Sequence, residues 1–284
     1  MGAHAILLLS CLDQKGLVAT VSEWIYRNGG NIIGADQHSD VDQGVFLQRV
    51  EWDLEGFALG RNEIAAQFRP IAERFRMRWD LRFTDQVTRM AILVSKLDHC
   101  LFDLLWRQKA AEFSAEVPLV VSNHEDLRPV AESFGARYEW RPVTPATRGE
   151  AETRLLSLLE EERIELLVLA RYMQVVGPRV LDLYPHRIIN IHHSFLPAFV
   201  GARSYHQAYE RGVKAIGATA HYVTAELDQG PIIEQDVART SHRDSVEDLL
   251  RKGRDLEKVV LARAVDLHLR HGVLVYGNKT VVFD

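Results

Sequence analysis

Residues 187–197 read Arg-Ile-Ile-Asn-Ile-His-His-Ser-Phe-Leu-Pro, and this stretch decides how the fold is interpreted. Its isoleucines predict a strand over residues 188–192 that is buried in a parallel sheet. Alternate residues of a strand share a face, so Asn190 and His192 are expected side by side, about 7 Å apart. Open α/β sheets bind ligands at the carboxyl ends of their strands. Either residue alone could be a structural polar group, but the pair is the first candidate for an active site.

Composition narrows the class of protein. The chain has 284 residues, a formal net charge of -5 and 47% hydrophobic residues, which fits a globular protein with one large domain or two smaller ones. No basic surplus indicates nucleic acid or a membrane as a partner. Cys11 and Cys100 form no disulfide framework or zinc pattern, so two buried thiols in a reducing compartment are expected. Without a signal-peptide pattern or an apolar run of about 18 residues, a cytoplasmic location is expected.

The apolar patterns over residues 1–86 predict the order strand, helix, strand, strand, helix, strand. This is the ferredoxin-like βαββαβ arrangement. The short polar segment Thr84-Asp85-Gln86 marks the expected domain boundary. The predicted strands cover residues 3–11, 31–39, 44–52 and 77–83, and the predicted helices cover residues 17–27 and 61–75.

From residue 87 to residue 284 strands and helices alternate, which predicts a mostly parallel, Rossmann-like sheet with helical crossovers. A long helix over residues 245–270 follows, whose charged residues, Glu257 among them, are expected to form a solvated face. A hairpin over residues 273–283 ends the chain. The other expected strands are 90–95, 118–122, 136–140, 166–170, 188–192, 216–223 and 232–237, and the other helices are 101–113, 127–134, 150–163 and 177–183.

One loop argues against a phosphorylated ligand. The first strand of the second domain is followed by Ser95 to Cys100, which contains no glycine and carries one carboxylate. Phosphate-binding loops at this place use glycine to bring backbone N–H groups to the ligand. A phosphate site at this turn is therefore disfavoured.

A second polar cluster lies downstream of the central strand. Asp228 stands in a turn defined by the Gly-Pro pair that follows it. By itself it would be an ordinary hydrogen-bonding turn residue. Together, the segments Asn-Ile-His-His-Ser-Phe-Leu-Pro and His-x-Val…Asp-x-Gly-Pro-Ile resemble the 10-formyltetrahydrofolate-dependent formyltransferases. The resemblance implies a formyltransferase-like domain with a catalytic trio of Asn190, His192 and Asp228.

Within this family the chain most closely resembles the formyltetrahydrofolate deformylases. A small domain precedes the catalytic one, His-His-Ser replaces the His-Pro-Ser of the transferases, and the glycine-rich phosphate loop is missing. The resemblance implies hydrolysis of 10-formyltetrahydrofolate to tetrahydrofolate and formate, which supplies purine biosynthesis and balances one-carbon folate pools. Folate is the substrate, and no cofactor or metal is implied. The residues expected to bind it are Arg171, Tyr172, Met173, His193, Ser194 and His221.

The expected chemistry follows from the trio. Asp228 is predicted to act as the base for water, or to order water through His192, with a pKa raised by desolvation in the cleft. Asn190 and a protonated His192 would donate hydrogen bonds to the formyl oxygen as negative charge develops there. His193 is expected to narrow the side of the site where a transferase holds its amine.

The first domain resembles the ACT domains in its opening Asp-Gln-Lys-Gly-Leu-Val turn. In that family this loop and the next strand commonly bind a small amino acid at a subunit interface. A glycine with free helix-terminal N–H groups could receive the carboxylate. Dimerisation alone and amino-acid sensing both remain open, and a homo-oligomer is expected in either case. The candidate regulatory site comprises Asp13, Gln14, Lys15, Gly16, Asn31 and Ile32.

Three other functions compete with hydrolysis. A metal-dependent amidohydrolase could draw ligands from six residues, but none of their spacings is a recognisable ligand set. A non-catalytic folate or amino-acid sensor would not need the water-activating carboxylate. A formyltransferase with an amine acceptor would release its product only when the amine is supplied. The six residues are His186, His192, His193, His206, His221 and Asp228.

Overall fold

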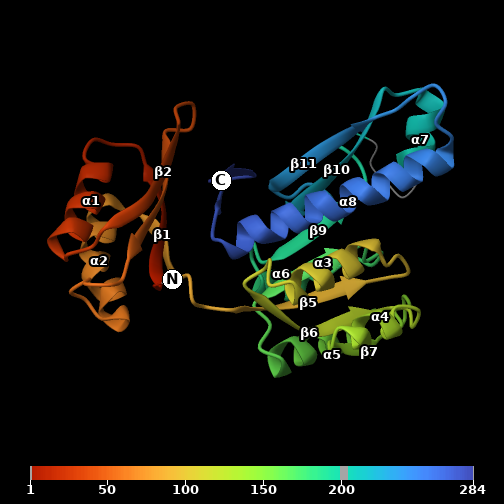
Figure 1. Ribbon diagram of the computed structural model, residues 1–284, viewed down its shortest axis with the longest axis horizontal. Coiled ribbons are helices and arrows are strands. Elements are labelled where there is room, and N and C mark those ends of the chain that lie inside the picture. The colour runs from red at the N-terminus through yellow and green to blue at the C-terminus, as the bar shows by residue number, and fades with distance from the viewer. Residues whose placement is uncertain (1, 199–203, 284) are drawn as a thin grey trace. The chain divides into compact units, whose positions relative to one another are not determined.

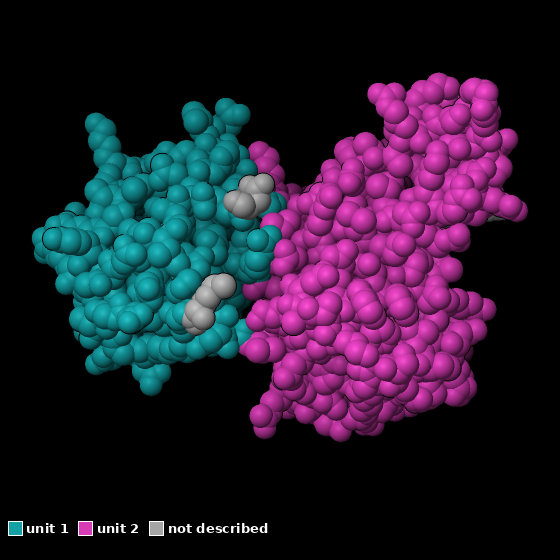
Figure 2. All heavy atoms as spheres, viewed as in Figure 1, with its two compact units in different colours: residues 1–86, 270–276, 281–284 teal, residues 87–269, 277–280 magenta. Residues whose placement is uncertain are grey.

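The structure, a computed structural model, describes residues 2–198 and 204–283. The chain divides into two compact units, which are coloured differently in Figure 2. Unit 1 comprises residues 1–86, 270–276 and 281–284, and unit 2 comprises residues 87–269 and 277–280. Within the described ranges no helix has the length and apolar composition needed to cross a membrane.

Unit 1 contains β1 (His4–Leu12), α1 (Leu17–Arg27), β2 (Ile32–Asp40), β3 (Val45–Asp53), α2 (Arg61–Phe75) and β4 (Arg78–Phe83). The strands form one antiparallel sheet in the order β2-β3-β1-β4, and α1 and α2 lie together beside it (Figure 1). Val21 and Ile25 of α1 and Ile64 and Phe68 of α2 are almost fully buried in its core. The element order and the antiparallel pairing agree with the predicted βαββαβ arrangement.

The C-terminal segment forms the two-stranded sheet of β12 (Val273–Tyr276) and β13 (Lys279–Val282), as the sequence predicted. In unit 1, Arg49 Nε donates to the carbonyl oxygen of His271 at 3.2 Å. The hairpin turn belongs to unit 2, where Asn278 Nδ2 donates to the carbonyl oxygen of Gln229 at 2.9 Å. Each unit therefore contains part of the last residues of the chain.

Unit 2 is organised around a seven-stranded sheet. Its strands are β5 (Thr88–Val94), β6 (Ala115–Ser122), β7 (Arg137–Trp140), β8 (Leu166–Ala170), β9 (Ile188–His192), β10 (Ala215–Tyr222) and β11 (Ile232–Arg239). Its helices are α3 (His99–Lys109), α4 (Arg128–Ser133), α5 (Arg148–Glu161), α6 (Pro178–Leu183), α7 (Ser204–Arg211) and α8 (Val246–Leu269). The strand order is β11-β10-β9-β8-β5-β6-β7; β5 to β9 run parallel, whereas β10 runs antiparallel to both of its neighbours, β9 and β11. This confirms the predicted mostly parallel α/β sheet.

Helices cover both faces of this sheet. Leu158 of α5 and Val180 of α6 pack with Leu93 of β5 in one apolar cluster. The neighbouring strand residues Ile92 and Val168 are equally buried and point to the other face, because side chains alternate along a strand. On the second face α8 packs over β9, β10 and β11 and beside α3 (Figure 1). The strands are therefore apolar on both sides, and polar residues come at their ends.

The strand register sets the positions of the first candidate residues. β9 and β10 pair antiparallel with Asn190 opposite His221, so these two side chains share one face of the sheet. The strand order reverses at β5, because β6 and β7 lie on one side of it and β8 and β9 on the other. A crevice forms at the carboxyl ends of the strands next to such a reversal. The end of β9 lies at that edge.

Most predicted elements agree with the structure to within a few residues, but α7 was not predicted. Only Ser204, Tyr205 and Ala208 of its eight residues are buried, so it lacks the repeated apolar positions that identify a longer helix. The predicted end of α3 at residue 113 is wrong as well. Ala111 has a φ of +57°, a left-handed conformation that ends a helix.

Candidate active site

A cavity of about 280 Å³ lies at the ends of β8 and β9. It brings together the predicted trio and most of the predicted binding residues. Those that line it are Asn190, His192, Asp228, Arg171, Tyr172, Met173, His193 and His221. Ser194 does not line this cavity. Its Oγ donates instead to the carbonyl oxygen of Ala198 at 2.7 Å, so the side chain holds the backbone that follows β9.

Asp228 reaches the cavity from the loop between β10 and β11. Its φ is +56°, a left-handed conformation that Asp adopts more readily than most residues. Gly230 then passes directly against β10. A Cβ at this position would lie 1.7 Å from the carbonyl oxygen of Tyr222, so the position excludes every side chain. The close approach holds the loop at the end of β10 and brings the Asp228 carboxylate to the imidazoles.

The Asp228 carboxylate lies between two imidazoles. Its Oδ2 is 3.3 Å from His192 Nδ1, and its Oδ1 is 3.7 Å from His221 Nε2. His221 Nδ1 lies 2.9 Å from the carbonyl oxygen of Tyr222. That oxygen can only accept, so His221 Nδ1 carries a proton. The Nε2 atom of a neutral His221 then accepts from Asn190 Nδ2 at 3.2 Å. The trio and His221 form one connected network.

The ionisation of Asp228 differs from the prediction. The contact with His192 lowers the pKa of Asp228 well below its usual range, although partial burial opposes it. The predicted rise of this pKa by desolvation is therefore wrong, because the His192 imidazole stabilises the anion by more than the cleft destabilises it. Asp228 is an ionised hydrogen-bond acceptor and a poor proton acceptor near neutral pH.

His192 keeps one ring nitrogen for chemistry. Its Nδ1 faces Asp228, and its Nε2 is buried without a hydrogen-bond partner among the described residues. An imidazole that is oriented by a carboxylate on one nitrogen can take up a proton on the other, and the carboxylate stabilises the imidazolium that forms. Asn190 has a second amide N–H to donate. The arrangement can activate water and stabilise a developing oxyanion.

The segment after β8 lines the cavity with Arg171, Tyr172 and Met173. Two polar residues that the sequence analysis did not assign to the site hold this segment. The backbone N–H of Met173 donates to Ser95 Oγ at 2.9 Å, and Ser95 Oγ donates to Asn123 Oδ1 at 2.7 Å. Ser95 and Asn123 each follow a buried strand directly, and His192 ends one. A polar residue at the carboxyl end of an apolar strand is therefore a signal that could have identified Ser95 and Asn123. Burial raises the pKa of Tyr172 to about 12, so its phenol is neutral.

A second cavity, of about 170 Å³, shares four lining residues with the first. It contains two cations that the sequence analysis did not assign to a site, Arg141 and Arg148. Arg141 pairs with Glu139 at 2.6 Å, and its Nε is buried without a hydrogen-bond partner in the described part of the chain. No sequence pattern distinguishes these arginines from those of an exposed helix face. The shared residues are Tyr172, Gln174, Val175 and Val176.

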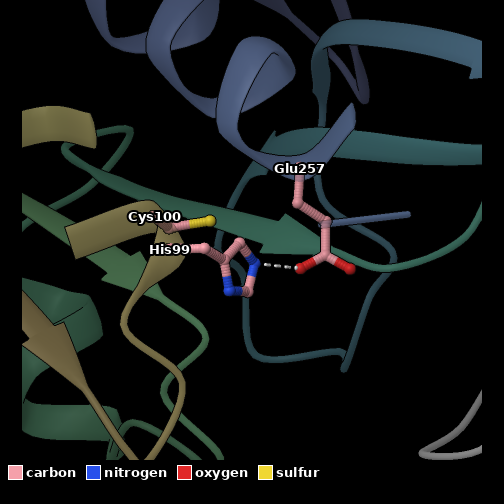
Figure 3. Close-up of side chains that lie close together, drawn as sticks. All are labelled: His99, Cys100 and Glu257. Carbon is pink, nitrogen blue, oxygen red and sulfur yellow. Dashed lines mark hydrogen bonds and ion pairs between the residues drawn. The ribbon is translucent and has the colours of Figure 1, made fainter. Parts of the chain in front are cut away.

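One group of side chains in the described ranges could offer three metal ligands. His99, Cys100 and Glu257 have ligand atoms within 4.8 Å of one another (Figure 3). Glu257 already has a counter-ion, since Arg171 Nε lies 3.4 Å from its Oε2, and a second cation would meet that positive charge. Burial and, next, Glu257 raise the pKa of the Cys100 thiol well above its usual range, which makes it a poor ligand. The group contains none of the six residues considered for a metal-dependent amidohydrolase.

The predicted regulatory residues lie at opposite ends of the sheet in unit 1. The loop of residues 13–16 follows the end of β1 that pairs with Val45 of β3. Ile32, next to Asn31, pairs with Trp52 at the other end of β3. From Val45 to Trp52 the strand spans about 24 Å. The structure therefore does not bring the two parts of the predicted site together within one chain.

Comparison with known proteins covers both units. Residues 88–265 match the Formyl transferase family model. A formyltetrahydrofolate deformylase from Synechocystis sp. is 56% identical over 279 residues, which are 98% of either chain. The crystal structure of a formyltetrahydrofolate deformylase from Pseudomonas syringae pv. tomato, at 46% identity, has a TM-score of 0.98 and covers 100% of this chain and 95% of that one. Glycinamide ribonucleotide transformylase 1 from Symbiobacterium toebii, at 31% identity, has a TM-score of 0.66 over 70% of this chain and 95% of its own.

Proposed function

The chain belongs to the formyltetrahydrofolate deformylase family, and from that premise we propose that the cavity with Asn190, His192 and Asp228 is its active site. The enzyme is a hydrolase that converts 10-formyltetrahydrofolate to tetrahydrofolate and formate. The observation that carries the assignment of the site is the 3.3 Å contact of Asp228 with His192 in a cavity that Asn190 also lines. The formate supplies purine biosynthesis, and the free tetrahydrofolate returns to the one-carbon pool.

His192 acts on the attacking water. With Asp228 on Nδ1, its Nε2 takes a proton while the water oxygen bonds to the formyl carbon. Asp228 stays ionised, as its lowered pKa requires, and stabilises the imidazolium. The imidazolium then gives a proton to N10 as the C–N10 bond breaks. Of the two roles predicted for Asp228, its ionisation supports the ordering of water through His192 over direct deprotonation.

Asn190 stabilises the charge that develops on the formyl oxygen. One N–H of its amide donates to His221 at 3.2 Å, and the other is available for the oxyanion. His221, held by the carbonyl oxygen of Tyr222, orients this amide. A donor that is in place before the reaction needs no reorganisation, and losing one such donor typically costs about 100- to 1000-fold in rate.

The two adjoining cavities fit the two ends of a folate. Tyr172 and Met173 offer an aromatic and a thioether surface to the faces of the folate rings. Arg141 and Arg148 offer cations to the glutamate carboxylates. His193, whose ring centroid is 5.1 Å from that of His192, narrows the reaction site. Water is therefore a better fit there than an amine carried on a larger molecule.

The direct test is an enzyme-coupled formate assay. The purified protein should release formate from 10-formyltetrahydrofolate without an added amine, because water is the acceptor. The same reaction is then run with a series of small primary amines. Formate release that is independent of amine supports the hydrolase. Consumption of substrate only when an amine is present would contradict it and would favour the transferase.

Unit 1 is proposed to be an ACT-type regulatory domain. Its βαββαβ order supports this, as does Gly16, which precedes α1 with a φ of +92° and no side-chain cap. The helix N-terminus there has free N–H groups that could bind an amino-acid carboxylate. Because the two predicted binding stretches lie about 24 Å apart along β3, a site made from both needs a second copy of the chain.

The edge of the unit 1 sheet supports a homo-oligomer. β2 lies at the end of the strand order, and its residues are largely exposed, with Ile33 at 47%. A long edge strand is a ready surface for pairing with another copy. Analytical ultracentrifugation should find an oligomer, and the formate assay repeated with glycine and methionine should find an effector of the rate. A monomer at assay concentration would contradict the shared site.

A further inference from the structure

Among the described residues, Glu257 is the only Asp or Glu that is almost fully buried. Its position on α8 was predicted to belong to a solvated face, and that prediction is wrong, since the side chain is 2% exposed. Burial of an ionised carboxylate costs several kcal/mol unless partners compensate it. The residue therefore needs an explanation that the folding of α8 alone does not supply.

Three side chains from α3, from α7 and from the segment after β8 meet on this carboxylate. His99 Nε2 lies 2.8 Å from Oε2, Tyr205 Oη donates to Oε1 at 2.7 Å, and Arg171 Nε lies 3.4 Å from Oε2 (Figure 3 shows the first of these). Burial alone would raise the pKa of Glu257, but His99, Arg171 and Tyr205 outweigh it and the pKa is lowered. Glu257 is thus an anion with both oxygens in use.

The fold makes specific room for this cluster. Gly253 lies one helical turn before Glu257, on the same face of α8. A Cβ at Gly253 would lie 2.2 Å from the ring and hydroxyl atoms of Tyr205. The missing side chain therefore lets the Tyr205 ring cross α8 and reach the carboxylate. Helix α7 supplies Tyr205, so this short helix is held to α8 through the same contact.

The cluster adjoins the active-site cavity through Arg171. This residue contacts Glu257 and also lines the cavity that contains His192 and Asp228. Its φ of +64° turns the chain sharply at the end of β8. A long, charged side chain at such a turn has many rotamers, and an ion pair that is nearly free of solvent restricts them. Glu257 is the only carboxylate that pairs with Arg171 within the described residues.

We propose that Glu257 is a positioning residue for the hydrolysis, and that it acts through Arg171 by fixing the guanidinium at the wall of the folate cavity. The inference rests on the proposed function, because it takes Arg171 as a residue that contacts the folate. His99 and Tyr205 hold Glu257 in place. Substrate affinity therefore depends on a carboxylate that never touches the substrate.

The test is a double-mutant cycle measured on KM. Glu257→Gln and Arg171→Gln should each raise KM for 10-formyltetrahydrofolate about tenfold, as is typical when a supporting partner of a site residue is lost. The double variant should be no worse than either single one, because one interaction is removed in all three. The matched control is Glu247→Gln, an exposed glutamate in the first turn of the same helix, which should leave KM unchanged.

Each outcome decides a separate point. A KM for Glu257→Gln within about twofold of wild type, or single effects that multiply in the double variant, would overturn the inference. Loss of formate release in the wild type would instead overturn the proposed function. If Glu257→Gln does not fold by circular dichroism, Glu257→Asp replaces it. That variant keeps the charge but shortens the reach to Arg171, so an unchanged KM would again overturn the inference.

Discussion

Asp228 and Glu257 are two carboxylates of the same unit in different surroundings. Both have a lowered pKa and both contact imidazoles, so both are anions near neutral pH. Two partners of Glu257, His99 and Tyr205, lie at 2.8 and 2.7 Å, Arg171 lies at 3.4 Å, and the Glu257 side chain is 2% exposed. The imidazoles of Asp228 lie at 3.3 and 3.7 Å, and its side chain is 12% exposed and lines a cavity. Both carboxylates are therefore ionised, but Glu257 has two short hydrogen bonds, whereas the contacts of Asp228 are longer.

The difference separates a group that can respond to a reaction from one that cannot. A long carboxylate–imidazole contact can shorten when the imidazole becomes an imidazolium. The added stabilisation is then present in the transition state and absent from the ground state, so it increases the rate. A carboxylate whose oxygens are both bonded at short distance is already at its optimum. We therefore expect Asp228 to matter mainly for turnover, and Glu257 for stability and for the placement of Arg171.

The largest expected effect is on turnover in Asp228→Asn. The variant keeps the shape and tolerates the left-handed backbone, but it removes the charge that stabilises the imidazolium of His192. We expect kcat to fall about 1000-fold or more. Formate release measures it, and the dissociation constant for tetrahydrofolate, which should change little, is the control. A variant that retains most of the wild-type kcat would show that this carboxylate is not part of the chemistry.

A smaller effect is expected on the stability of Glu257→Gln. The substitution leaves Arg171 buried without a full counter-charge, and breaking such a pair typically costs about 3 kcal/mol or more. Asp228→Asn removes a carboxylate whose imidazole contacts are longer, at 3.3 and 3.7 Å, and it should cost less, about 1 kcal/mol. Urea unfolding of the two variants beside the wild type measures both free energies. Equal losses would remove the distinction between the two carboxylates.

An effect below that of Glu257→Gln concerns His271 in unit 1, an imidazole whose surroundings are mainly cationic. Burial, followed by the charges of Arg82 and Arg49, lowers the pKa of His271 from 6.5 to about 4, and Asp80 opposes this only in part. The unfolded chain binds this proton at a higher pH than the folded chain does. The free energy of unfolding should therefore fall as the pH decreases through this window, by at most about 3 kcal/mol.

The variant His271→Asn tests this dependence. Asn tolerates the φ of +53° at this position and has no charge to gain. Urea unfolding between about pH 7 and pH 4.5 should show a shallower loss of stability in the variant than in the wild type. If the free energy of unfolding fell equally with pH in the variant and the wild type, a group other than His271 would be responsible for the pH dependence.

Local signals made the central strand and the trio predictable. The run at residues 188–192 is apolar and β-branched, which identifies a buried strand, and its polar interruptions stand at its carboxyl end. The Gly-Pro pair after Asp228 identifies a turn. These features depend on neighbours within a few residues of each other, so the sequence exhibits them directly. The structure places the trio in one cavity, as the spacing and the resemblance implied.

Long-range contacts were not predictable in the same way. Glu257 lies on a helix rich in both charge signs, and nothing in its neighbours shows that Tyr205 and His99 meet it from α7 and α3. The pKa of Asp228 depends on its contact with His192, which lies on β9, and the Asp228 loop follows β10, whose register with β9 was unknown. The sequence allowed the burial of a carboxylate to be predicted, but not the partners that lower the pKa which burial alone would raise.

The C-terminal hairpin has a consequence for biosynthesis. Residues 270–276 and 281–284 belong to unit 1, and Asn278 binds the residue that follows Asp228. A ribosome makes residues 1–86 of unit 1 long before it makes residues 270–276, which belong to the same unit. The nascent chain therefore exposes an unfinished unit 1 while the whole of residues 87–269 is being made. A stop codon at residue 270 would damage both units at once, because it removes segments that belong to each of them.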